Sequence, residues 1–341
     1  MKVYQIHSYS GPDGLTCVER PEPIPAAGQI LIRVRAASLN YRDLMVVRGE
    51  YGGRQRQNLI PMSDGAGEVI GIGEGVTRVK IGDRVAGNVF QTWLAGDITS
   101  ENMKEDLGVG IDGMLAQYVM LSADGVVHLP PHLTYEEGAT LPCAALTAWN
   151  ALVVQGGVKA GDTVLILGTG GVSIFALQFA KLHGARVIMT SGSDAKLSRV
   201  RAFGADETIN YTGTPHWERT VWELAGKRGV DHVIEVGGAG TLEKSLRSVR
   251  YGGRISLIGV LSGLGGTVNP LPVLFKSVTM QGIYIGSREM FETMNRAIAQ
   301  AALKPIIDRV FPFAEAPEAY RYLHTAAHMG KVVIGMDDRY L

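Results

Sequence analysis

The sequence has only two cysteines, Cys17 and Cys143, and they lie far apart in the chain. Two isolated thiols exclude a disulfide framework, and they exclude a zinc lobe built from four cysteines. An excess of either charge is also missing, because 33 basic and 33 acidic residues give a formal net charge of zero. This balance gives no bulk electrostatic reason to expect nucleic acid or a membrane surface as a partner.

Long apolar runs are absent as well. No segment approaches the length of a membrane span, and MKVYQIHSYSGPDGL lacks the apolar core of a signal peptide. We therefore expect a cytoplasmic protein that acts on a small-molecule substrate, with no nucleic acid and no membrane partner. Glycine, in contrast, is abundant, with 44 of 341 residues, and indicates many tight turns. The length predicts two domains.

The strongest pattern lies in residues 164–206, VLILGTGGVSIFALQFAKLHGARVIMTSGSDAKLSRVRAFGAD. Residues 164–167 form a short apolar run, which is typical of a buried parallel strand. A glycine turn follows, then helical spacing over residues 174–182 that Gly184 ends. Residues 186–189 predict the next strand. This βαβ unit has the length that holds a dinucleotide.

The turn itself carries the binding argument. Gly168 permits a tight turn, and Gly170 lets the backbone approach a pyrophosphate, which the helix N-terminus would stabilise. Ser173 stands where G-x-G-x-x-G has its third glycine, but a small residue still allows helix and strand to pack closely. The alternative is an α/β crossover that binds nothing. We predict that the cofactor contacts the turn residues Gly168, Thr169, Gly170, Gly171 and Val172.

The end of the second strand indicates which dinucleotide binds. NAD sites usually place an acid about 20 residues past the first glycine, where it bonds the ribose 2′-hydroxyl. Residues 189–193 contain no acid, and Asp194 comes late. The hydroxyls of Ser191 and Ser193, with Lys196 behind them, suit a 2′-phosphate instead. The alternative is a polar loop before a charged helix face. We predict NADPH as the cofactor.

The rest of the chain predicts a β-rich part followed by alternating strands and helices. Short candidate strands occupy much of residues 1–125, whereas strands and helices alternate to about residue 270, as in a doubly wound parallel sheet. A helix is expected over residues 135–157 with Thr134 as its N-cap, and the tail is expected to rejoin the N-terminal part. The loop Phe90–Asp112 either covers a pocket with Trp93 or packs that side chain locally.

Several motifs together resemble those of the medium-chain dehydrogenases/reductases, specifically their zinc-free branch that includes quinone oxidoreductases. The resemblance spans nearly the whole chain. It is carried by AASLNYRD (36–43), MSDGAGEVIGIGEGV (62–76), LPCAALTAW (141–149), LGTGGVS (167–173), FGAD (203–206), VGGAGT (236–241), GGRISLIG (252–259) and HMGKVVI (328–334).

The resemblance implies an α/β protein with a GroES-like β-barrel catalytic domain and a Rossmann doubly wound parallel sheet. Residues 1–126 and 271–341 would form the discontinuous catalytic domain, and residues 127–270 the NADP-binding domain. The active site would lie in the cleft between the domains. The family often forms a homodimer through the last Rossmann strand, near Tyr284.

The resemblance also implies that the catalytic zinc of the family's alcohol dehydrogenases is missing. Asn40 stands at the first cysteine position, Ser63 at the histidine position and Cys143 at the third position. An amide, a hydroxyl and one thiol do not make the tetrahedral site that zinc prefers. Without a metal, Asn40 and Tyr51 are the candidate hydrogen-bond donors to the substrate, and a structural role is the alternative for each.

Two acids, Asp43 and Asp64, are expected to orient the neighbours of these donors, and Arg42 is expected to pair with one of them. The family's pattern places further residues at the cofactor, on the motifs that match. These residues are Thr147, Tyr211, Val236, Gly237, Ile258, Gly259, Val260, Gly282, Ile283, Tyr284 and Lys331.

The sequence therefore predicts a zinc-independent, NADPH-dependent oxidoreductase that reduces a quinone or an activated C=C bond. One alternative is an NADP-dependent alcohol or aldehyde dehydrogenase. Another, of a different class, is a protein that binds NADPH without turnover and has a structural or regulatory role.

Overall fold

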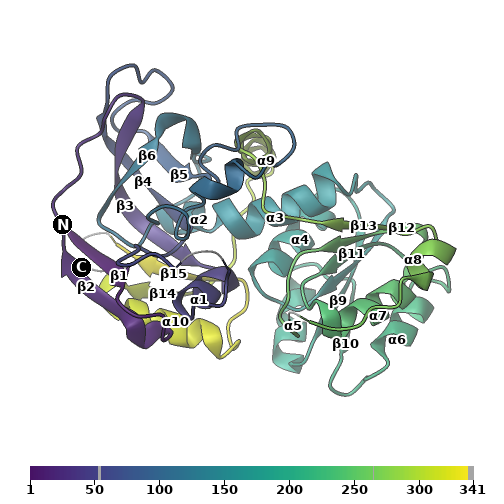
Figure 1. Ribbon diagram of the computed structural model, residues 1–341. Helices are drawn as coiled ribbons and strands as arrows, with labels where there is room; N and C mark the ends of the chain where they lie inside the picture. Colours follow the sequence, from purple (N-terminus) through teal and green to yellow (C-terminus); the bar gives the residue numbers. More distant parts are fainter. Residues whose placement is uncertain (53–54, 264, 337–341) are drawn as a thin grey trace. The chain divides into compact units, whose positions relative to one another are not determined.

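The computed structural model describes residues 1–52, 55–263 and 265–336. The chain divides into two compact units: unit 1 comprises Met1–Leu146 and Ile285–Leu341, and unit 2 comprises Thr147–Tyr284. Unit 1 takes the purple, blue and yellow ends of the chain, and unit 2 the teal and green middle (Figure 1). The sequence predicts these two domain boundaries earlier in the chain, after residues 126 and 270.

Unit 2 contains a parallel sheet of six strands in its described part, in the order β10-β9-β8-β11-β12-β13. Its strands are β8 (Thr163–Leu167), β9 (Arg186–Ser191), β10 (Glu207–Asn210), β11 (Val230–Glu235), β12 (Val249–Leu257) and β13 (Thr279–Gly282). Every residue of β8 and of β11 is buried, as expected for central strands covered on both faces. This confirms the predicted doubly wound sheet.

Helix α3 (Leu146–Trp149) precedes the sheet. The helices that connect its strands are α4 (Gly171–Leu182), α5 (Asp194–Ala202), α6 (Trp217–Leu224), α7 (Ala239–Ser248) and α8 (Leu271–Phe275). Helix α4 packs against β8 and β9, α5 against β9 and β10, and α7 against β11 and β12. Each crossover thus covers the pair of strands that it joins, which leaves the carboxyl ends of the strands open to a ligand.

Unit 1 contains a mostly antiparallel sheet in the order β14-β15-β3-β4-β5-β7, with β6 also paired to β3, and a separate pair β1-β2. Its strands are β1 (Lys2–Ile6), β2 (Leu15–Glu19), β3 (Gln29–Leu39), β4 (Asp64–Ile72), β5 (Arg84–Gly87), β6 (Tyr118–Ser122), β7 (Val126–His128), β14 (Ile307–Pro312) and β15 (Lys331–Gly335). Its helices are α1 (Tyr41–Val47), α2 (Tyr135–Ala139), α9 (Arg288–Gln300) and α10 (Ala316–His324), and short 3-10 turns occur at Pro12–Gly14, Asn102–Glu105, Ala123–Gly125 and Phe313–Glu315.

The last described strand returns to the first part of the chain. Strand β15 pairs antiparallel with β3, and Val332 lies opposite Leu39. In Figure 1 the yellow β15 accordingly runs beside the purple β3, and β14 pairs with the other edge of β15. This register brings Lys331, the first residue of β15, next to Asn40, which follows β3 directly.

The single helix expected after Thr134 is interrupted. Helix α2 begins as predicted, with a capping box between Thr134 and Glu137. Two π-helical segments then flank α3, η4 (Leu141–Ala145) and η5 (Asn150–Val154). Pro142 lacks the N–H that an α-helical bond needs, so the backbone is wider there.

Across the described ranges, none of the helices combines the length and the apolar character that crossing a bilayer requires.

Candidate active site

In unit 2, the residues assigned to the cofactor follow the carboxyl ends of the parallel strands. The turn 168–171 follows β8, Ser191 ends β9, and Tyr211 follows β10. Val236 follows β11, and Ile258 follows β12. The strand order reverses between β8 and β11, and doubly wound sheets bind their ligands at this reversal. The predicted residues therefore share the sheet edge where a dinucleotide would lie.

The glycine turn fits a pyrophosphate. Gly168 has a φ of +72°, which a residue with a side chain rarely adopts. A Cβ added to Gly170 would meet no atom within 4 Å, so open space lies beside this backbone for a ligand. Ser173, at the third glycine position, donates its hydroxyl to the carbonyl of Leu167 at 2.7 Å. The serine thus ties α4 to the end of β8.

The loop after β9 is closely organised. The Ser191 hydroxyl accepts the N–H of Ser193 at 3.3 Å, and the Ser193 hydroxyl caps α5 by accepting the N–H of Lys196 at 3.4 Å. The Tyr211 ring lies against Gly192, where an added Cβ would stand 2.9 Å from the phenol oxygen. The four predicted residues of the 2′-phosphate end are therefore neighbours.

The late acid of this loop, Asp194, already has a partner. Its carboxylate accepts a hydrogen bond from Nδ2 of Asn210 at 2.7 Å, and it occupies the first turn of α5. A carboxylate there stabilises the helix N-terminus. The chemistry of this end, two hydroxyls and a lysine without an acid in residues 189–193, fits a 2′-phosphate.

Sequence reasoning missed Glu235, a fully buried acid at the end of β11. One carboxylate oxygen accepts the N–H groups of Gly237 at 2.8 Å and Gly238 at 3.1 Å and the hydroxyl of Thr241 at 2.6 Å. The other oxygen accepts the hydroxyl of Ser245. This carboxylate fixes the turn after β11. An acid at a strand end followed by two glycines and a threonine was the available signal.

Backbone hydrogen bonds join the turn after β12 to the end of β11. The N–H groups of Ile258 and Gly259 donate to the carbonyl of Glu235 at 2.9 and 3.3 Å. A Cβ at Gly259 would come within 2.4 Å of the Val236 carbonyl oxygen, so only glycine fits. Among the remaining predicted cofactor residues of unit 2, Val260 follows Gly259, Gly282 ends β13, and Ile283 and Tyr284 come directly after it, whereas Thr147 is buried on α3.

In unit 1, a group of polar residues assembles from four separate segments. We call it the Asn40 cluster, and it consists of Asn40, Asp43, Ser63, Asp64, Cys143 and Lys331. Its members come from the start of α1, the start of β4, the π-helical segment η4 and the start of β15. It includes three of the four predicted catalytic residues and also Lys331.

Lys331 is the least expected member. Its Nζ donates to the carbonyl oxygen of Leu39 at 2.7 Å and to Oδ1 of Asn40 at 2.5 Å. It also lies 3.8 Å from Oδ2 of Asp64, and only 2% of the lysine side chain is exposed. The family's pattern assigned this lysine to the cofactor, whereas in unit 1 its ammonium contacts the Asn40 cluster.

The Asp43 carboxylate holds the backbone of the cluster. It accepts the N–H of Asn40 at 2.8 Å and that of Ser63 at 3.2 Å, and so joins the start of α1 to β4. Burial raises the pKa of Asp43 to about 6, although the nearby Arg42 favours the charged form.

Asp64 is held in the same way. It accepts the hydroxyl of Ser63 at 2.8 Å and the N–H of Cys143 at 3.2 Å. Burial raises the pKa of Asp64, and the Lys331 ammonium opposes that rise. Both acids thus accept hydrogen bonds from backbone N–H groups of neighbouring segments.

The two polar atoms of the Asn40 amide, Oδ1 and Nδ2, differ in their hydrogen bonding. Its Oδ1 accepts from Lys331, whereas its Nδ2 is buried and none of the described residues accepts a hydrogen bond from it in good geometry. The Asn40 side chain does approach the Asp64 carboxylate, and this weaker interaction helps to lower the pKa of Asp64. A buried donor without an acceptor costs about 1–3 kcal/mol. An acceptor oxygen on a ligand that reached this atom would complete its bonding.

The donor set of this cluster does not fit a catalytic zinc. Oδ1 of Asn40 already accepts from an ammonium, and the Ser63 hydroxyl already donates to Asp64. Burial, with the neighbouring Asp64, raises the pKa of the Cys143 thiol to about 12, which opposes the thiolate that zinc binds. Within the described ranges, no group of three or more His, Cys, Asp or Glu residues is arranged to hold a metal.

The prediction that Arg42 pairs with Asp43 or Asp64 was wrong. Its guanidinium pairs with Asp106 at 2.8 Å and donates to the Leu107 carbonyl at 3.2 Å. The carboxylates of Asp43 and Asp64 already accept other hydrogen bonds, so the loop after β5 provides the acid. Tyr51, the fourth predicted catalytic residue, places its ring 4.9 Å from the Arg42 guanidinium carbon. Tyr51 thus lies beside α1 through this cation–π contact.

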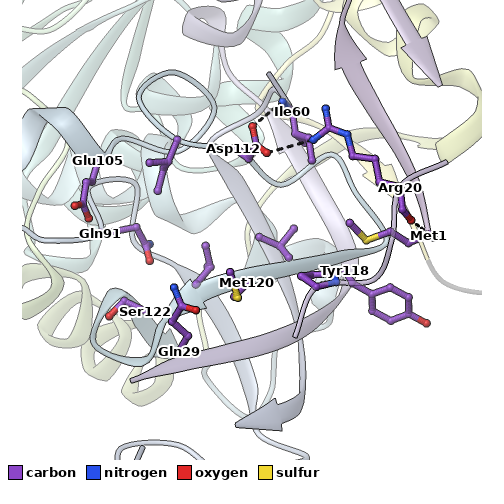
Figure 2. A pocket seen from close by; sticks show the side chains of 15 residues that line it. Met1, Arg20, Gln29, Ile60, Gln91, Glu105, Asp112, Tyr118, Met120 and Ser122 are labelled. Atoms are coloured by element: carbon purple, nitrogen blue, oxygen red, sulfur yellow. Dashed lines mark hydrogen bonds and ion pairs between the residues drawn. The ribbon is translucent and has the colours of Figure 1, made fainter. Parts of the chain in front are cut away.

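Trp93 packs locally, which was one of the two alternatives for its loop. Only 4% of the residue is exposed, its ring lies 6.1 Å from that of Phe90, and its indole N–H donates to Gly96 at 2.9 Å. A cavity of about 420 Å³ lies along β6 in the same unit, and Figure 2 shows the side chains around it. No predicted catalytic residue is among its described lining residues.

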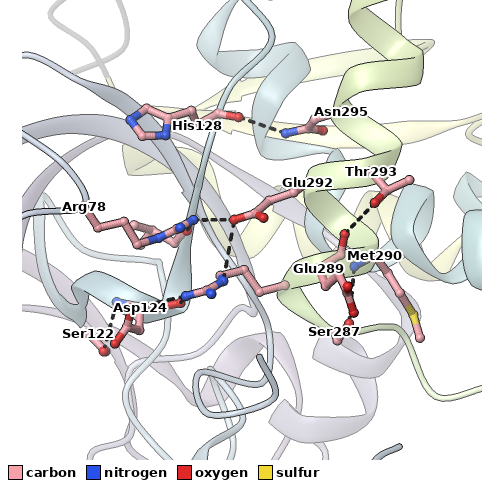
Figure 3. A network of polar contacts seen from close by, with 12 residues as sticks. Arg78, Ser122, Asp124, His128, Ser287, Glu289, Met290, Glu292, Thr293 and Asn295 are labelled. Atoms are coloured by element: carbon pink, nitrogen blue, oxygen red, sulfur yellow. Dashed lines mark hydrogen bonds and ion pairs between the residues drawn. The ribbon is translucent and has the colours of Figure 1, made fainter. Parts of the chain in front are cut away.

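Helix α9 is anchored in unit 1 by a polar network (Figure 3). Glu292 pairs with Arg78 at 2.5 Å and with Arg288 at 3.5 Å, and Arg288 reaches Asp124 at 3.2 Å. Asn295 donates to the carbonyl of His128 at 2.9 Å. These contacts hold the helix with which the chain re-enters unit 1.

Comparisons with known proteins agree with this architecture. Residues 26–131 match the alcohol dehydrogenase GroES-like domain, and residues 171–300 match the zinc-binding dehydrogenase domain. A zinc-type alcohol dehydrogenase-like protein of Schizosaccharomyces pombe is 43% identical, over 91% of each chain. The quinone oxidoreductase of Rattus norvegicus is 28% identical, over 98% of this chain and 97% of its own.

A solved structure of an NAD-dependent alcohol dehydrogenase is 34% identical, with a TM-score of 0.90 over 99% of this chain and 100% of its own. The dinucleotide edge of unit 2, the barrel of unit 1 and these relatives lead to one conclusion: the chain belongs to the medium-chain dehydrogenase/reductase superfamily and is an oxidoreductase.

Proposed function

We propose that this protein is a zinc-independent, NADPH-dependent oxidoreductase that reduces a quinone or an activated C=C bond. The observation that carries the proposal is the Asn40 cluster, which has a buried amide donor where the family's zinc enzymes have a metal ligand. Such a site can bind a substrate oxygen by hydrogen bonding and without a Lewis acid.

The cofactor proposal rests on the edge of unit 2. The glycine turn would hold the pyrophosphate, and Ser191, Ser193 and Lys196 would bind the 2′-phosphate. When bound, NADPH supplies the hydride of the reaction. A charge-assisted contact from Lys196 is strong enough to select the phosphate. One solved relative is described as NAD-dependent, so the preference is a property to measure for this chain.

The residues of unit 1 would stabilise the charge that the reaction develops. Reduction of an enone at its β-carbon leaves negative charge on the carbonyl oxygen, and the Asn40 amide would donate a hydrogen bond to it. Asp43 and Asp64 keep the surrounding backbone in place. The α-carbon then takes a proton from the Tyr51 hydroxyl or from water. A quinone needs less of this help, because its charge spreads over the ring.

We also propose a homodimer formed through β13. This strand is last in the sheet order of unit 2, and all four of its residues are exposed. Large exposed apolar residues accompany it, namely Leu271, Leu274, Phe275, Met280 and Tyr284. An apolar strand edge of this kind pairs readily with a second copy. The cytoplasmic location expected from the sequence remains a prediction.

A turnover panel tests the function. Purified protein is assayed with NADPH and with NADH against enones, quinones and aldehydes, and with NADP⁺ against alcohols, each with and without a chelator. We expect NADPH-dependent reduction of enones or quinones that survives the chelator, and well under one zinc per chain by elemental analysis. Alcohol oxidation alone would favour the dehydrogenase alternative. NADPH binding without any turnover would favour the non-catalytic one.

A further inference from the structure

The contact with Lys331 distinguishes the oxygen of the Asn40 side-chain amide from its nitrogen. An ammonium can only donate, so the amide atom 2.5 Å from Nζ must be the oxygen Oδ1. Nδ2 is therefore the other end, and it is the buried donor without an acceptor among the described residues. The orientation of the amide thus follows from its neighbour.

We propose that Lys331 is a positioning residue that orients and polarises the Asn40 amide toward the substrate. The inference rests on the proposed function, since it assigns the oxygen of the substrate as the missing acceptor. A cation on the amide oxygen draws electron density from the nitrogen, so Nδ2–H becomes a stronger donor. The lysine thus supplies positive charge through an amide in a site whose donors do not fit zinc.

Packing alone does not account for a charged residue here. Burying an ammonium is costly unless it is paired and hydrogen-bonded. Lys331 meets that cost with the Leu39 carbonyl, Asn40 and the Asp64 carboxylate. Strand β15 is already held to β3 by backbone pairing from Val332 onward. An apolar side chain of similar length would therefore keep the strand pairing, and it would remove the charge together with its contacts to Leu39, Asn40 and Asp64.

The chain offers a control for removing a hydrogen-bonded lysine that is partly buried. Lys276 in unit 2 donates to the carbonyls of Leu246, Arg247 and Val249 at 2.9–3.0 Å, and so caps the end of α7. Burial lowers its pKa. Because Lys276 has no role in the proposed site, Lys276→Met shows the general effect of this substitution on folding and turnover.

The kinetic test compares Lys331→Met, Lys331→Arg and Lys276→Met with the wild type on an enone. We expect Lys331→Met to lower kcat by about 10–10²-fold, below the full loss of an oxyanion donor, with the NADPH dissociation constant within about twofold of wild type. Lys331→Arg should recover much of the rate, and Lys276→Met should keep it. Unchanged kcat in Lys331→Met would overturn the proposal, as would a weakened NADPH affinity with normal kcat.

A second test needs no substrate. The side-chain amide signals of ¹⁵N-asparagine-labelled protein are recorded, and Asn40→Asp identifies the Asn40 signal by its loss. We expect Lys331→Met to shift the Asn40 signal and speed its exchange with water, and Lys276→Met to leave it alone. If Lys331→Met changes neither the chemical shift nor the exchange rate of the Asn40 signal, the proposal is wrong. A protein that shows this coupling but reduces neither enones nor quinones would instead refute only the proposed function.

Discussion

Asn40 illustrates how much one side chain can decide in this protein. Its carbonyl oxygen is fixed by Lys331, and its nitrogen is left as a buried donor. Tyr51, the other candidate donor, lies on the guanidinium of Arg42. The two candidates therefore occupy different surroundings, and substitutions can separate them.

Asn40→Asp keeps an oxygen for Lys331 but removes both N–H donors. We expect it to lower kcat on enones by about 10²–10³, the scale for losing an oxyanion donor. Tyr51→Phe keeps the ring on Arg42 and removes only the hydroxyl, and we expect a loss of roughly 10² on enones. Steady-state kinetics on enones and quinones measure both effects.

Quinone turnover is the internal control, and it should fall much less in both variants. The NADPH dissociation constant should stay unchanged, because neither residue belongs to unit 2. If enone turnover survives both substitutions, the roles assigned to Asn40 and Tyr51 are wrong.

Lys196 is expected to set the cofactor preference. NADPH should bind at least tenfold more tightly than NADH, a difference of about 1.4 kcal/mol, and Lys196→Ala should narrow that gap. Titration of intrinsic fluorescence with each cofactor gives the two dissociation constants. Lys181→Ala removes a lysine of the same unit that pairs with Asp206 at 2.8 Å, and it should leave the gap intact. Equal affinities in the wild type would contradict the prediction.

At the scale of elements, the connection from β8 to α4 depends on one hydroxyl. Ser173→Ala loses the 2.7 Å bond to the Leu167 carbonyl, and we expect unfolding to become easier by about 1 kcal/mol. Ser173→Gly restores the usual glycine pattern but should cost about 1 kcal/mol more, because glycine is a poor helix former. Urea unfolding measures both. A glycine variant as stable as wild type would show that the hydroxyl contributes nothing.

The starts of β8 and β11 are joined by a charge cluster that should make stability depend on pH. Burial opposes ionisation of Asp231, but the Thr163 N–H and the guanidiniums of Arg250 and Arg228 hold its pKa below the ordinary 3.8. A lowered acid pKa stabilises the fold above the unfolded-state value, and this stabilisation disappears as the pH falls through the folded-state value.

Asp231→Asn should therefore be less stable than wild type at pH 7, by about 1–3 kcal/mol, and the gap should close as the pH falls below about 4. Tryptophan fluorescence during urea unfolding follows unit 2, which contains Trp149, Trp217 and Trp222 of the four tryptophans. A gap that is constant from pH 7 to pH 3 would exclude the electrostatic explanation.

Local patterns predicted the elements well where local physics decides them. The strand 164–167, the helix 174–182 and the capping box at Thr134 all follow from apolar runs, glycine stops and side-chain caps. The prediction of one continuous helix after Thr134 was wrong from the segment that contains Pro142 onward. Hydrophobic periodicity alone does not show which backbone hydrogen bonds a proline removes. The partner of Arg42 was missed for another reason, since Asp106 lies 64 residues away in sequence.

The candidate site was predictable only in part for the same reason. The glycine turn and the residues after each parallel strand share one edge because parallel topology requires it. The contact between Lys331 and Asn40 joins residues 291 positions apart, and no local pattern encodes it. Only the pairing of β15 with β3 brings these side chains together.

For the whole molecule, the exposed edge at β13 predicts self-association. Met280→Lys places a charge on this strand, which discourages pairing between edges, and we expect it to convert a dimer into a monomer. Sedimentation velocity measures the change. Met103→Lys alters another methionine of similar exposure, 44% against 41%, in unit 1 and should leave the dimer intact. A wild-type protein that sediments as a monomer at all concentrations would contradict the homodimer.

The pairing of the last described strand with β3 also sets an order of events during translation. Unit 2 is contiguous, and all of it is synthesised before β14 and β15 exist. Asn40 is made 291 residues before the lysine that holds its amide, which is roughly 15–60 s at the usual speed of a ribosome. Throughout that interval the part of β3 that pairs with β15, residues 36–39, has a partner strand on one side only. The nascent chain can therefore complete unit 2 before the Asn40 cluster of unit 1 can form, because that cluster needs Lys331 from the last described strand.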